Sequence, residues 1–122
     1  MRKALRQARR AISTAERNTA ARRAARHLAR LARACGVRHV AAYLALSEEM
    51  ATRPAIRLLQ RQGCRIYVPK LAGAQLRFAP LRGALKRNRY RIAEPVAARR
   101  PPRLDLIVMP LVAFDAGGAR LG

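Results

Sequence analysis

The stretch LDLIVMPLVAF, residues 104–114, decides the fold. Its apolar residues do not alternate with polar ones, which is typical of a parallel strand whose two faces are both covered. A glycine-rich loop with one arginine, DAGGARLG, follows directly at residues 115–122. A strand that runs into such a loop resembles the start of a phosphate-binding loop. The stretch therefore predicts a buried strand of an α/β sheet with a ligand site at its carboxyl end.

The residues before this stretch predict alternating helices and strands. Residues 1–34 carry apolar side chains at helical spacing, with a break at Ser13, where STAE matches a capping box. Residues 37–46 predict a first strand and residues 64–71 a second. A helix over residues 53–62 lies between them.

Two further segments separate the second predicted strand from the last. Residues 75–81 form a short alternating stretch, and residues 82–103 are irregular and basic. Strands separated by helices indicate a parallel sheet. The predicted fold class is α/β, a Rossmann-like three-layer parallel sheet with flanking helices. We assign residues 1–122 to a single domain, and we expect it to be incomplete at the C-terminus because three strands make a small sheet.

The composition is strongly basic. Lysine and arginine number 27 against six acidic residues, which gives a formal net charge of +21. Such a charge attracts nucleic acid, nucleotides, polyanionic cofactors or an anionic membrane. A genome rich in arginine and alanine codons explains the charge equally well. The hydrophobic content of 51% is enough for a packed core, which excludes a disordered basic tail.

The sequence gives no membrane or secretory signal. No apolar run approaches the ~18 residues of a membrane span. The basic N-terminus is not followed by the apolar stretch of a signal peptide. Cys35 and Cys64 lack the spacing of a metal or redox motif. We therefore expect reduced thiols and a cytoplasmic protein.

Two loops beyond the predicted strands carry candidate site residues. In the first, Glu48 and Glu49 are placed either to bind a ligand or to stabilise the start of the next helix. In the second, the glycines of FDAGGARLG let backbone N–H groups approach an anion. Arg120 is placed there to neutralise a phosphoryl group and Asp115 to hold Mg²⁺. An ordinary turn is the alternative interpretation of this loop.

Two more charged features stand outside these loops. Arg2 and Arg6 are one helical turn apart and share a face, which either grips a phosphate or is simply solvated. Glu94 either contacts a ligand or pairs with a nearby arginine. The chain has neither a G-x-x-x-x-G-K-[ST] loop nor a G-x-G-x-x-G motif.

Six motifs in order resemble those of the 5-formyltetrahydrofolate cyclo-ligase family, also called methenyltetrahydrofolate synthetases. RKALR resembles the family's K-x-x-L-R opening, and YLALSEEMATRP resembles Y-L-x-x-x-x-E-x-D-T-R-P. RIYVPKL, LRFAPL and NRYRIAEP follow in the family's order. LDLIVMPLVAFDAGGARLG resembles the strongest signature, D-L-I-x-x-P-x-x-A-F-D-x-x-G-x-R-L-G. The resemblance covers essentially the whole chain and implies roughly the N-terminal two-thirds of a longer α/β domain, ending inside its ATP loop.

The resemblance also implies a set of site residues. Glu49 matches the folate-binding glutamate, and Leu44 matches a folate-contacting position. Arg120 is implied as the catalytic cation, and Ala51 stands where the family commonly has an acid. The implied ATP-binding residues are Arg2, Lys3, Ala4, Leu5 and Arg6 near the N-terminus, and Arg120, Leu121 and Gly122 in the loop.

The implied reaction is an ATP-dependent ring closure. The formyl oxygen of 5-formyltetrahydrofolate attacks the γ-phosphate of ATP, and the neighbouring amine then displaces phosphate to give 5,10-methenyltetrahydrofolate. Mg²⁺ is the implied cofactor, and the implied partners are ATP and the folate with its polyglutamates, on a monomer. Neither nucleic acid nor a membrane is expected as a partner. The alternatives are an arginine-rich nucleic-acid-binding module and an inactive truncated cyclo-ligase, and we expect little activity from these residues alone.

Overall fold

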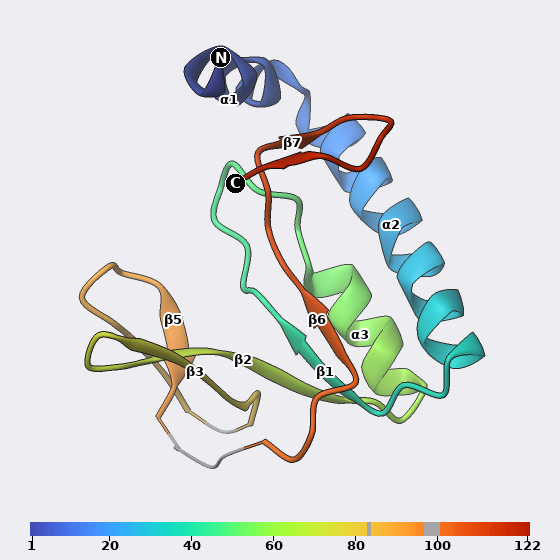
Figure 1. Cartoon of the computed structure of the whole chain (residues 1–122), viewed down its shortest axis with the longest axis vertical. Coiled ribbons are helices and arrows are strands. Elements are labelled where there is room, and N and C mark those ends of the chain that lie inside the picture. The colour runs from blue at the N-terminus through green and yellow to red at the C-terminus, as the bar shows by residue number, and fades with distance from the viewer. Residues whose placement is uncertain (83, 97–100) are drawn as a thin grey trace.

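A four-stranded sheet carries two helices on one face, and a third helix lies across one end of the molecule (Figure 1). The computed structural model describes residues 1–82, 84–96 and 101–122. The helices are α1 (Arg2–Ala11), α2 (Thr14–Ala34) and α3 (Arg53–Arg61). The strands of the main sheet are β1 (His39–Ala42), β2 (Arg65–Ala72), β3 (Gln75–Pro80) and β6 (Leu106–Val108). Two small hairpins pair β4 (Leu85–Arg87) with β5 (Ala93–Pro95), and β7 (Ala113–Phe114) with β8 (Arg120–Leu121).

The break between the first two helices is the capping box that the sequence predicts. The hydroxyl of Ser13 accepts a hydrogen bond from the backbone N–H of Glu16 at 3.2 Å, and the Ser13 N–H donates to the Glu16 carboxylate at 3.1 Å. These bonds satisfy backbone groups that a new helix leaves unpaired. Helix α2 ends before Gly36, whose φ of 63° lies in the left-handed region that glycine adopts without strain. None of the helices in the described ranges is both long and apolar enough to cross a membrane.

The strands run in the order β3-β2-β1-β6. Strand β1 is parallel to β2 and to β6, so that Val40 lies opposite Ile66 on one side and Leu106 on the other. Strand β3 turns back from β2 and pairs with it antiparallel. The predicted α/β class with parallel strands and flanking helices is therefore confirmed, and the sheet is mixed.

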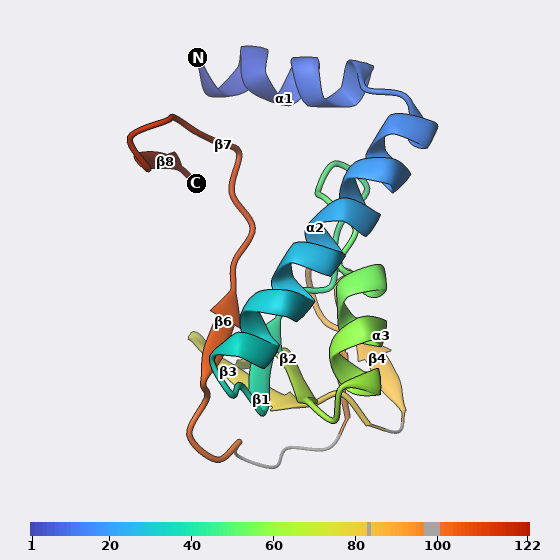
Figure 2. The same cartoon turned by 90° about the vertical axis from the view of Figure 1, so that its right-hand side faces the viewer.

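The core lies between the sheet and the α2–α3 pair. Val40, Ala42, Ile66 and Val68 alternate along β1 and β2, and all four pack in one buried cluster with Leu59 of α3. The same cluster includes Ala32 of α2 and Ile56 of α3, so both helices cover the same face of the sheet (Figure 2). The opposite face is open at its β6 edge, where the Ile107 side chain is 48% exposed, while Ala41 of β1 and Tyr67 of β2 on that face are buried. The predicted flanking helices thus form one layer on this sheet in the described part of the chain.

Two strand predictions were wrong in length. The first strand spans only His39–Ala42 and not residues 37–46, because the chain leaves the sheet early to form the loop before α3. The predicted strand at residues 104–114 divides in two, β6 and β7. Pro110 lies between them and has no N–H to donate to a ladder. Beyond it, β7 pairs with β8 and not with β1.

The predicted irregular segment at residues 82–103 contains the β4–β5 hairpin, and its residues 83 and 97–100 lie outside the described residues. Glu94 fixes this hairpin to the main sheet. Its carboxylate is 4% exposed and accepts hydrogen bonds from the Leu71 N–H at 3.0 Å and the Asn88 side chain at 3.2 Å. The bond from Leu71 lowers the pKa of Glu94. Within the described residues Glu94 therefore has a structural role, and its two interpretations from sequence, a ligand contact or an arginine pair, stay predictions.

Arg91, in the turn between β4 and β5, has a φ of 60°. This left-handed conformation costs a non-glycine residue about 1–2 kcal/mol, while glycine loses ~0.5–1 kcal/mol of unfolded-state entropy. We therefore expect Arg91→Gly to raise the free energy of unfolding by about 0.5–1 kcal/mol, measured by urea denaturation. Arg91→Ala removes the same charge but keeps the strain, and equal stability of the two variants would contradict this explanation.

All six carboxylates of the chain accept hydrogen bonds inside the structure. Glu16 and Asp115 hold turns of the backbone, and Asp105 accepts from the N–H groups of Arg38 and His39 at 2.9 Å each. The remaining three are Glu48, Glu49 and Glu94. Each acidic side chain is therefore tied to a particular place in the fold, and the six together leave the net charge at +21.

Acid is expected to destabilise the fold through these groups. The N–H groups of Arg38 and His39 lower the pKa of Asp105, and that of Leu71 lowers the pKa of Glu94. Because the folded pKa values lie below the unfolded ones, the stabilisation is complete at neutral pH and is lost as the pH falls below about 4. Urea unfolding at a series of pH values measures this. The Asp105→Asn variant should have a lower free energy of unfolding than the unmodified chain at neutral pH, and this free energy should fall less steeply as the pH is lowered. If it falls as steeply in the variant as in the unmodified chain, Asp105 is not a source of the acid sensitivity.

Candidate functional site

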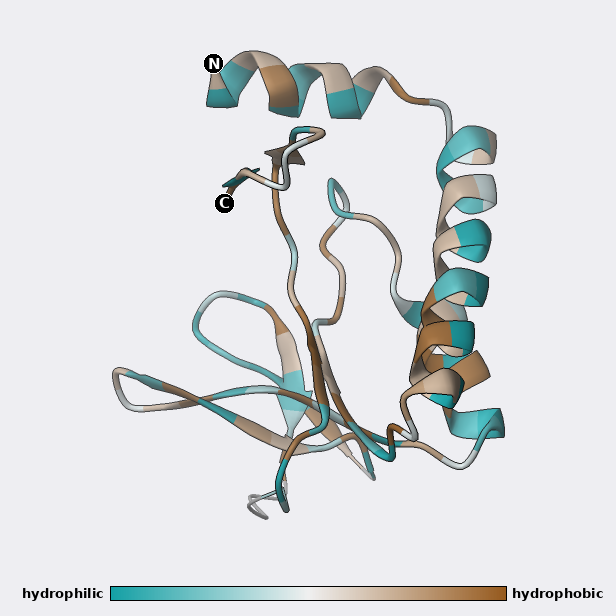
Figure 3. Cartoon of the chain, turned by 45° about the vertical axis from the view of Figure 1, so that its right-hand side comes forward, coloured by the Kyte–Doolittle hydropathy of each residue, from teal (hydrophilic) through white to brown (hydrophobic). Residues whose placement is uncertain are grey.

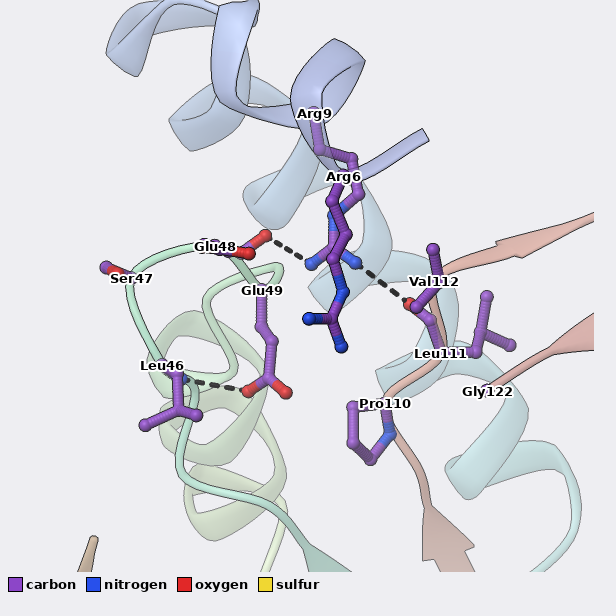
Figure 4. Close-up of a pocket in the computed structure, with 10 residues that line it drawn as sticks. All are labelled: Arg6, Arg9, Leu46, Ser47, Glu48, Glu49, Pro110, Leu111, Val112 and Gly122. Atoms are coloured by element: carbon purple, nitrogen blue, oxygen red, sulfur yellow. Dashed lines mark hydrogen bonds between the residues drawn. The ribbon is translucent and has the colours of Figure 1, made fainter. Parts of the chain in front are cut away.

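A pocket opens at the carboxyl ends of β1 and β6, where parallel strands present their ligand loops. The loop after β1 lines one side with residues 46–49, and the segment after β6 lines the other with residues 110–112. Helix α1 covers it with Arg6 and Arg9, and Gly122 completes the wall (Figure 4). The pocket has a volume of about 470 Å³. It therefore joins three parts of the sequence that are far apart along the chain.

Arginine side chains fix α1 over this pocket, because the helix itself buries no residue. The Arg9 guanidinium donates to the Leu111 carbonyl at 3.3 Å and also to the Glu48 carbonyl. Arg17 donates to the Ser47 carbonyl at 2.9 Å and to the Arg9 carbonyl at 2.6 Å. Arg9 thus connects both walls of the pocket, and Arg17 supports it from α2.

The side chains of Glu48 and Glu49 point in different directions and have different partners, although the two residues are adjacent in sequence. The Glu48 carboxylate forms an ion pair with Arg10, which lowers the pKa of Glu48. Glu49 turns inward, and one of its oxygens accepts from the Leu46 N–H at 2.9 Å (Figure 4). Its other oxygen accepts no hydrogen bond from the described residues. Glu48 therefore holds α1 in place, and Glu49 keeps one carboxylate oxygen without a hydrogen-bond partner among the described residues.

Arg6 extends into the same pocket as Glu49 (Figure 4). Within the described residues its guanidinium donates no hydrogen bond, unlike those of Arg9 and Arg17. A cation and a carboxylate in one cavity suit a ligand that has an anionic part and N–H donors. This pair is the chemical centre of the candidate site.

A second pocket of about 430 Å³ adjoins the first and shares the Glu48–Glu49 loop with it. Its walls are mainly apolar and include Tyr43, Met50 and Phe114. Burial raises the pKa of Tyr43, and the nearby Glu49 raises it further, so the phenol stays protonated at neutral pH. The phenol donates to the Met50 carbonyl at 3.1 Å. The two pockets also share Arg9 and residues 110–112, so a mainly apolar space lies directly beside the charged one.

The structure brings together only part of the predicted site. Arg6, Glu49 and Gly122 line one pocket. Leu44 lies behind the loop and packs against the core. The other predicted site residues do not line this pocket; they are Arg2, Lys3, Ala4, Leu5, Asp115, Arg120 and Leu121.

The glycine-rich segment forms a tight β7–β8 hairpin. The Asp115 side chain accepts from the Ala119 N–H at 2.9 Å, and Gly118 takes a φ of 83°. Arg120 lies opposite Phe114 in the ladder and is exposed. In the described residues no three His, Cys, Asp or Glu side chains gather as metal ligands. Asp115 therefore stabilises the turn of this hairpin, and its predicted binding of Mg²⁺ stays a prediction.

Arg9 belongs to the basic N-terminal helix that the sequence shows, but neither it nor residues 110–112 were among the predicted site residues. Arg9 is three positions after Arg6, so the helical repeat that paired Arg2 with Arg6 also points to Arg9. Residues 110–112 were hidden inside a predicted strand, and Pro110 was the signal that the strand ends earlier.

Comparisons with known proteins agree with the family that the motifs resemble. The profile of the 5-formyltetrahydrofolate cyclo-ligase family matches residues 1–122. The 5-formyltetrahydrofolate cyclo-ligase of Escherichia coli K12 is 35% identical over 128 residues, covering 97% of this chain and 70% of that protein.

Two solved structures resemble the fold. The NMR structure of Aquifex aeolicus 5,10-methenyltetrahydrofolate synthetase matches with a TM-score of 0.77 and 26% identity, over 99% of this chain and 64% of that one. A synthetase from Mycoplasma pneumoniae matches in fold with a TM-score of 0.66 and 21% identity, over 99% of this chain and 68% of that one. The chain thus spans about two-thirds of the length of these relatives.

Proposed function

The chain belongs to the 5-formyltetrahydrofolate cyclo-ligase family, and from this premise we propose that its pockets bind ATP and 5-formyltetrahydrofolate for ring closure to 5,10-methenyltetrahydrofolate. The observation that carries the proposal is that Arg6 and Glu49, implied for ATP and folate by separate motifs, line one pocket. Such convergence of distant residues is what a two-substrate reaction needs, because both reactants must be held in contact.

Each residue has a role that its surroundings support. Arg6 binds a phosphate of ATP, since its fork is free of partners in the described residues and suits phosphate oxygens. The free oxygen of Glu49 accepts an N–H of the folate's ring system and so orients it. The apolar pocket beside Tyr43 and Met50 takes the flat part of the folate. Arg9 and Glu48 also line the pocket, and their bonds hold α1 over it.

The reaction balances with these groups. The formyl oxygen attacks the γ-phosphorus, the bond to the β-phosphate oxygen breaks, and ADP leaves. The neighbouring secondary amine, which lies outside the fused ring, then attacks the formyl carbon, loses a proton, and expels phosphate as the five-membered ring closes. Negative charge builds on the phosphoryl oxygens during the first step, and a nearby cation lowers the energy of that transition state. Arg120 is the cation that we propose for this role.

Mg²⁺, when bound, supplies further positive charge at the phosphates. Asp115 has one oxygen engaged with Ala119 and does not line the pocket, so the described residues favour an ion carried in by ATP. We further propose a cytoplasmic monomer that accepts polyglutamates of the substrate, because a basic surface attracts their carboxylates. The pocket itself gives no reason to invoke nucleic acid.

Calorimetric titration of each ligand into two variants tests the proposal. Arg6→Gln is expected to weaken ATP binding on the order of tenfold or more and to spare the folate. Glu49→Gln is expected to weaken folate binding by a similar factor and to spare ATP. Arg77→Gln, an exposed arginine of β3, removes the same charge away from the pocket and should change neither affinity. Absence of binding by the unmodified chain, or an equal effect of Arg77→Gln, would overturn the assignment.

A further inference from the structure

Two rows of arginines run along the exposed sides of α2 and α3. Neighbours within each row are three or four positions apart, which places them on one side of their helix. The two helices pack side by side on the same face of the sheet (Figure 2), and hydrophilic segments recur along α2 (Figure 3). We call these residues the arginine face: Arg22, Arg26, Arg30 and Arg33 of α2, and Arg53, Arg57 and Arg61 of α3, all of them exposed.

The arginine face has no acidic counterpart. Helix α3 contains no acidic residue, and α2 contains only Glu16, which is engaged in the cap with Ser13. The other carboxylates accept hydrogen bonds elsewhere in the fold. None of the seven guanidiniums donates a hydrogen bond within the described residues. Neighbouring arginines on each helix therefore repel one another, and an anion laid along them relieves that repulsion.

The length of the arginine face excludes a single ATP as its partner. From Arg22 to Arg33 the helix rises ~16 Å, at about 1.5 Å per residue. One triphosphate is shorter than this row and cannot contact its whole length. The ATP- and folate-binding pocket is instead built from α1 and the loops after β1 and β6. The arginine face fits a ligand with many phosphates in a line.

Between the two large polyanions of a cell, the helices favour nucleic acid over a lipid surface. A helix that lies on a membrane inserts an apolar side, but in α2 that side is buried, with Ala25 at 1% and Ala32 at 0% exposure. Arginine forks suit phosphate oxygens. Neither helix carries a Phe, Tyr or Trp for stacking on bases.

We propose that the arginine face docks the phosphate backbone of nucleic acid without reading its sequence. This departs from the sequence-based expectation that nucleic acid is no partner, which rested on the ligands of the pocket. The proposal is independent of the cyclo-ligase assignment, because the arginine face shares no residue with the pocket.

Fluorescence anisotropy with a labelled single-stranded RNA of about 20 nucleotides, and with a duplex DNA of similar length, tests this across a range of salt concentrations. The variant Arg22→Gln, Arg26→Gln, Arg30→Gln, Arg33→Gln removes the α2 row. The control Arg65→Gln, Arg77→Gln, Arg82→Gln, Lys86→Gln removes the same charge from exposed positions on or next to the strands. Circular dichroism establishes that both variants are folded.

The row variant is expected to bind RNA at least ~10-fold more weakly at physiological salt, and the slope of log K against log salt should shrink by about 0.7 for each phosphate that the variant no longer neutralises. The control should weaken binding clearly less. Equal weakening in the two variants would mean that total charge alone attracts the RNA, which would overturn the proposal. Binding to phosphatidylserine vesicles is measured in the same way. The proposal would also be overturned if the row variant no longer bound these vesicles but bound both nucleic acids as tightly as the unmodified chain.

Discussion

Leu59→Ala is expected to lower the free energy of unfolding by about 2–5 kcal/mol. Leu59 is 1% exposed and belongs to the same buried cluster as Ala32 of α2 and Val40 of β1. Truncation there removes buried methyl groups and leaves a cavity that a sheet and two helices cannot easily close. Since domains of this size are stable by only ~5–15 kcal/mol, the variant loses a large share of its stability.

Urea denaturation at neutral pH measures the effect, and the dependence on urea should keep its slope if the unfolded state is unchanged. Leu58→Ala is the matched control, because it makes the same chemical change one position away on the same helix, where the side chain is only partly buried. A loss of stability at position 58 as large as that at position 59 would contradict the packing of α3.

In a complete cyclo-ligase domain, Arg120→Ala is expected to lower kcat by on the order of 10²-fold or more while the affinity for 5-formyltetrahydrofolate changes little. Arg120 is exposed in β8, and two residues later Gly122 lines the pocket. A cation in this position that meets charge developing on the γ-phosphoryl group stabilises the transition state more than the bound substrates.

Steady-state rates of methenyltetrahydrofolate formation, together with folate titrations, separate these effects. Arg120→Lys keeps the charge but not the planar fork, so it should recover part of the rate. An Arg120→Ala variant with unchanged kcat and weakened ATP binding would make Arg120 a binding residue only.

Local signals made most of the fold predictable. The capping box at Ser13 and the glycine at position 36 act through neighbouring backbone groups, so the sequence shows them directly. The β4–β5 hairpin was missed because it depends on Glu94 reaching Leu71 of another strand. No pattern within residues 82–103 contains that contact.

The candidate site divides in the same way. The family motifs predicted Glu49 and Arg6, which do line one pocket, but motifs describe sequence and not orientation. They could not show that Glu48 turns outward to Arg10 while Glu49 turns inward. Nor could they show that Arg9 joins both walls, since its acceptors are main-chain carbonyls, which look alike in every sequence.

Because all six carboxylates accept hydrogen bonds inside the structure, acidic and basic positions should tolerate mutation to different degrees. The 27 basic residues far outnumber the six acidic ones, so most single arginines can change to a neutral residue without loss of a hydrogen bond or ion pair to a carboxylate. A carboxylate has no substitute nearby, since each already holds a backbone turn, a strand or a helix in place. Among descendants of this sequence, the basic positions should therefore vary in number and place, while the acidic ones should remain few and fixed.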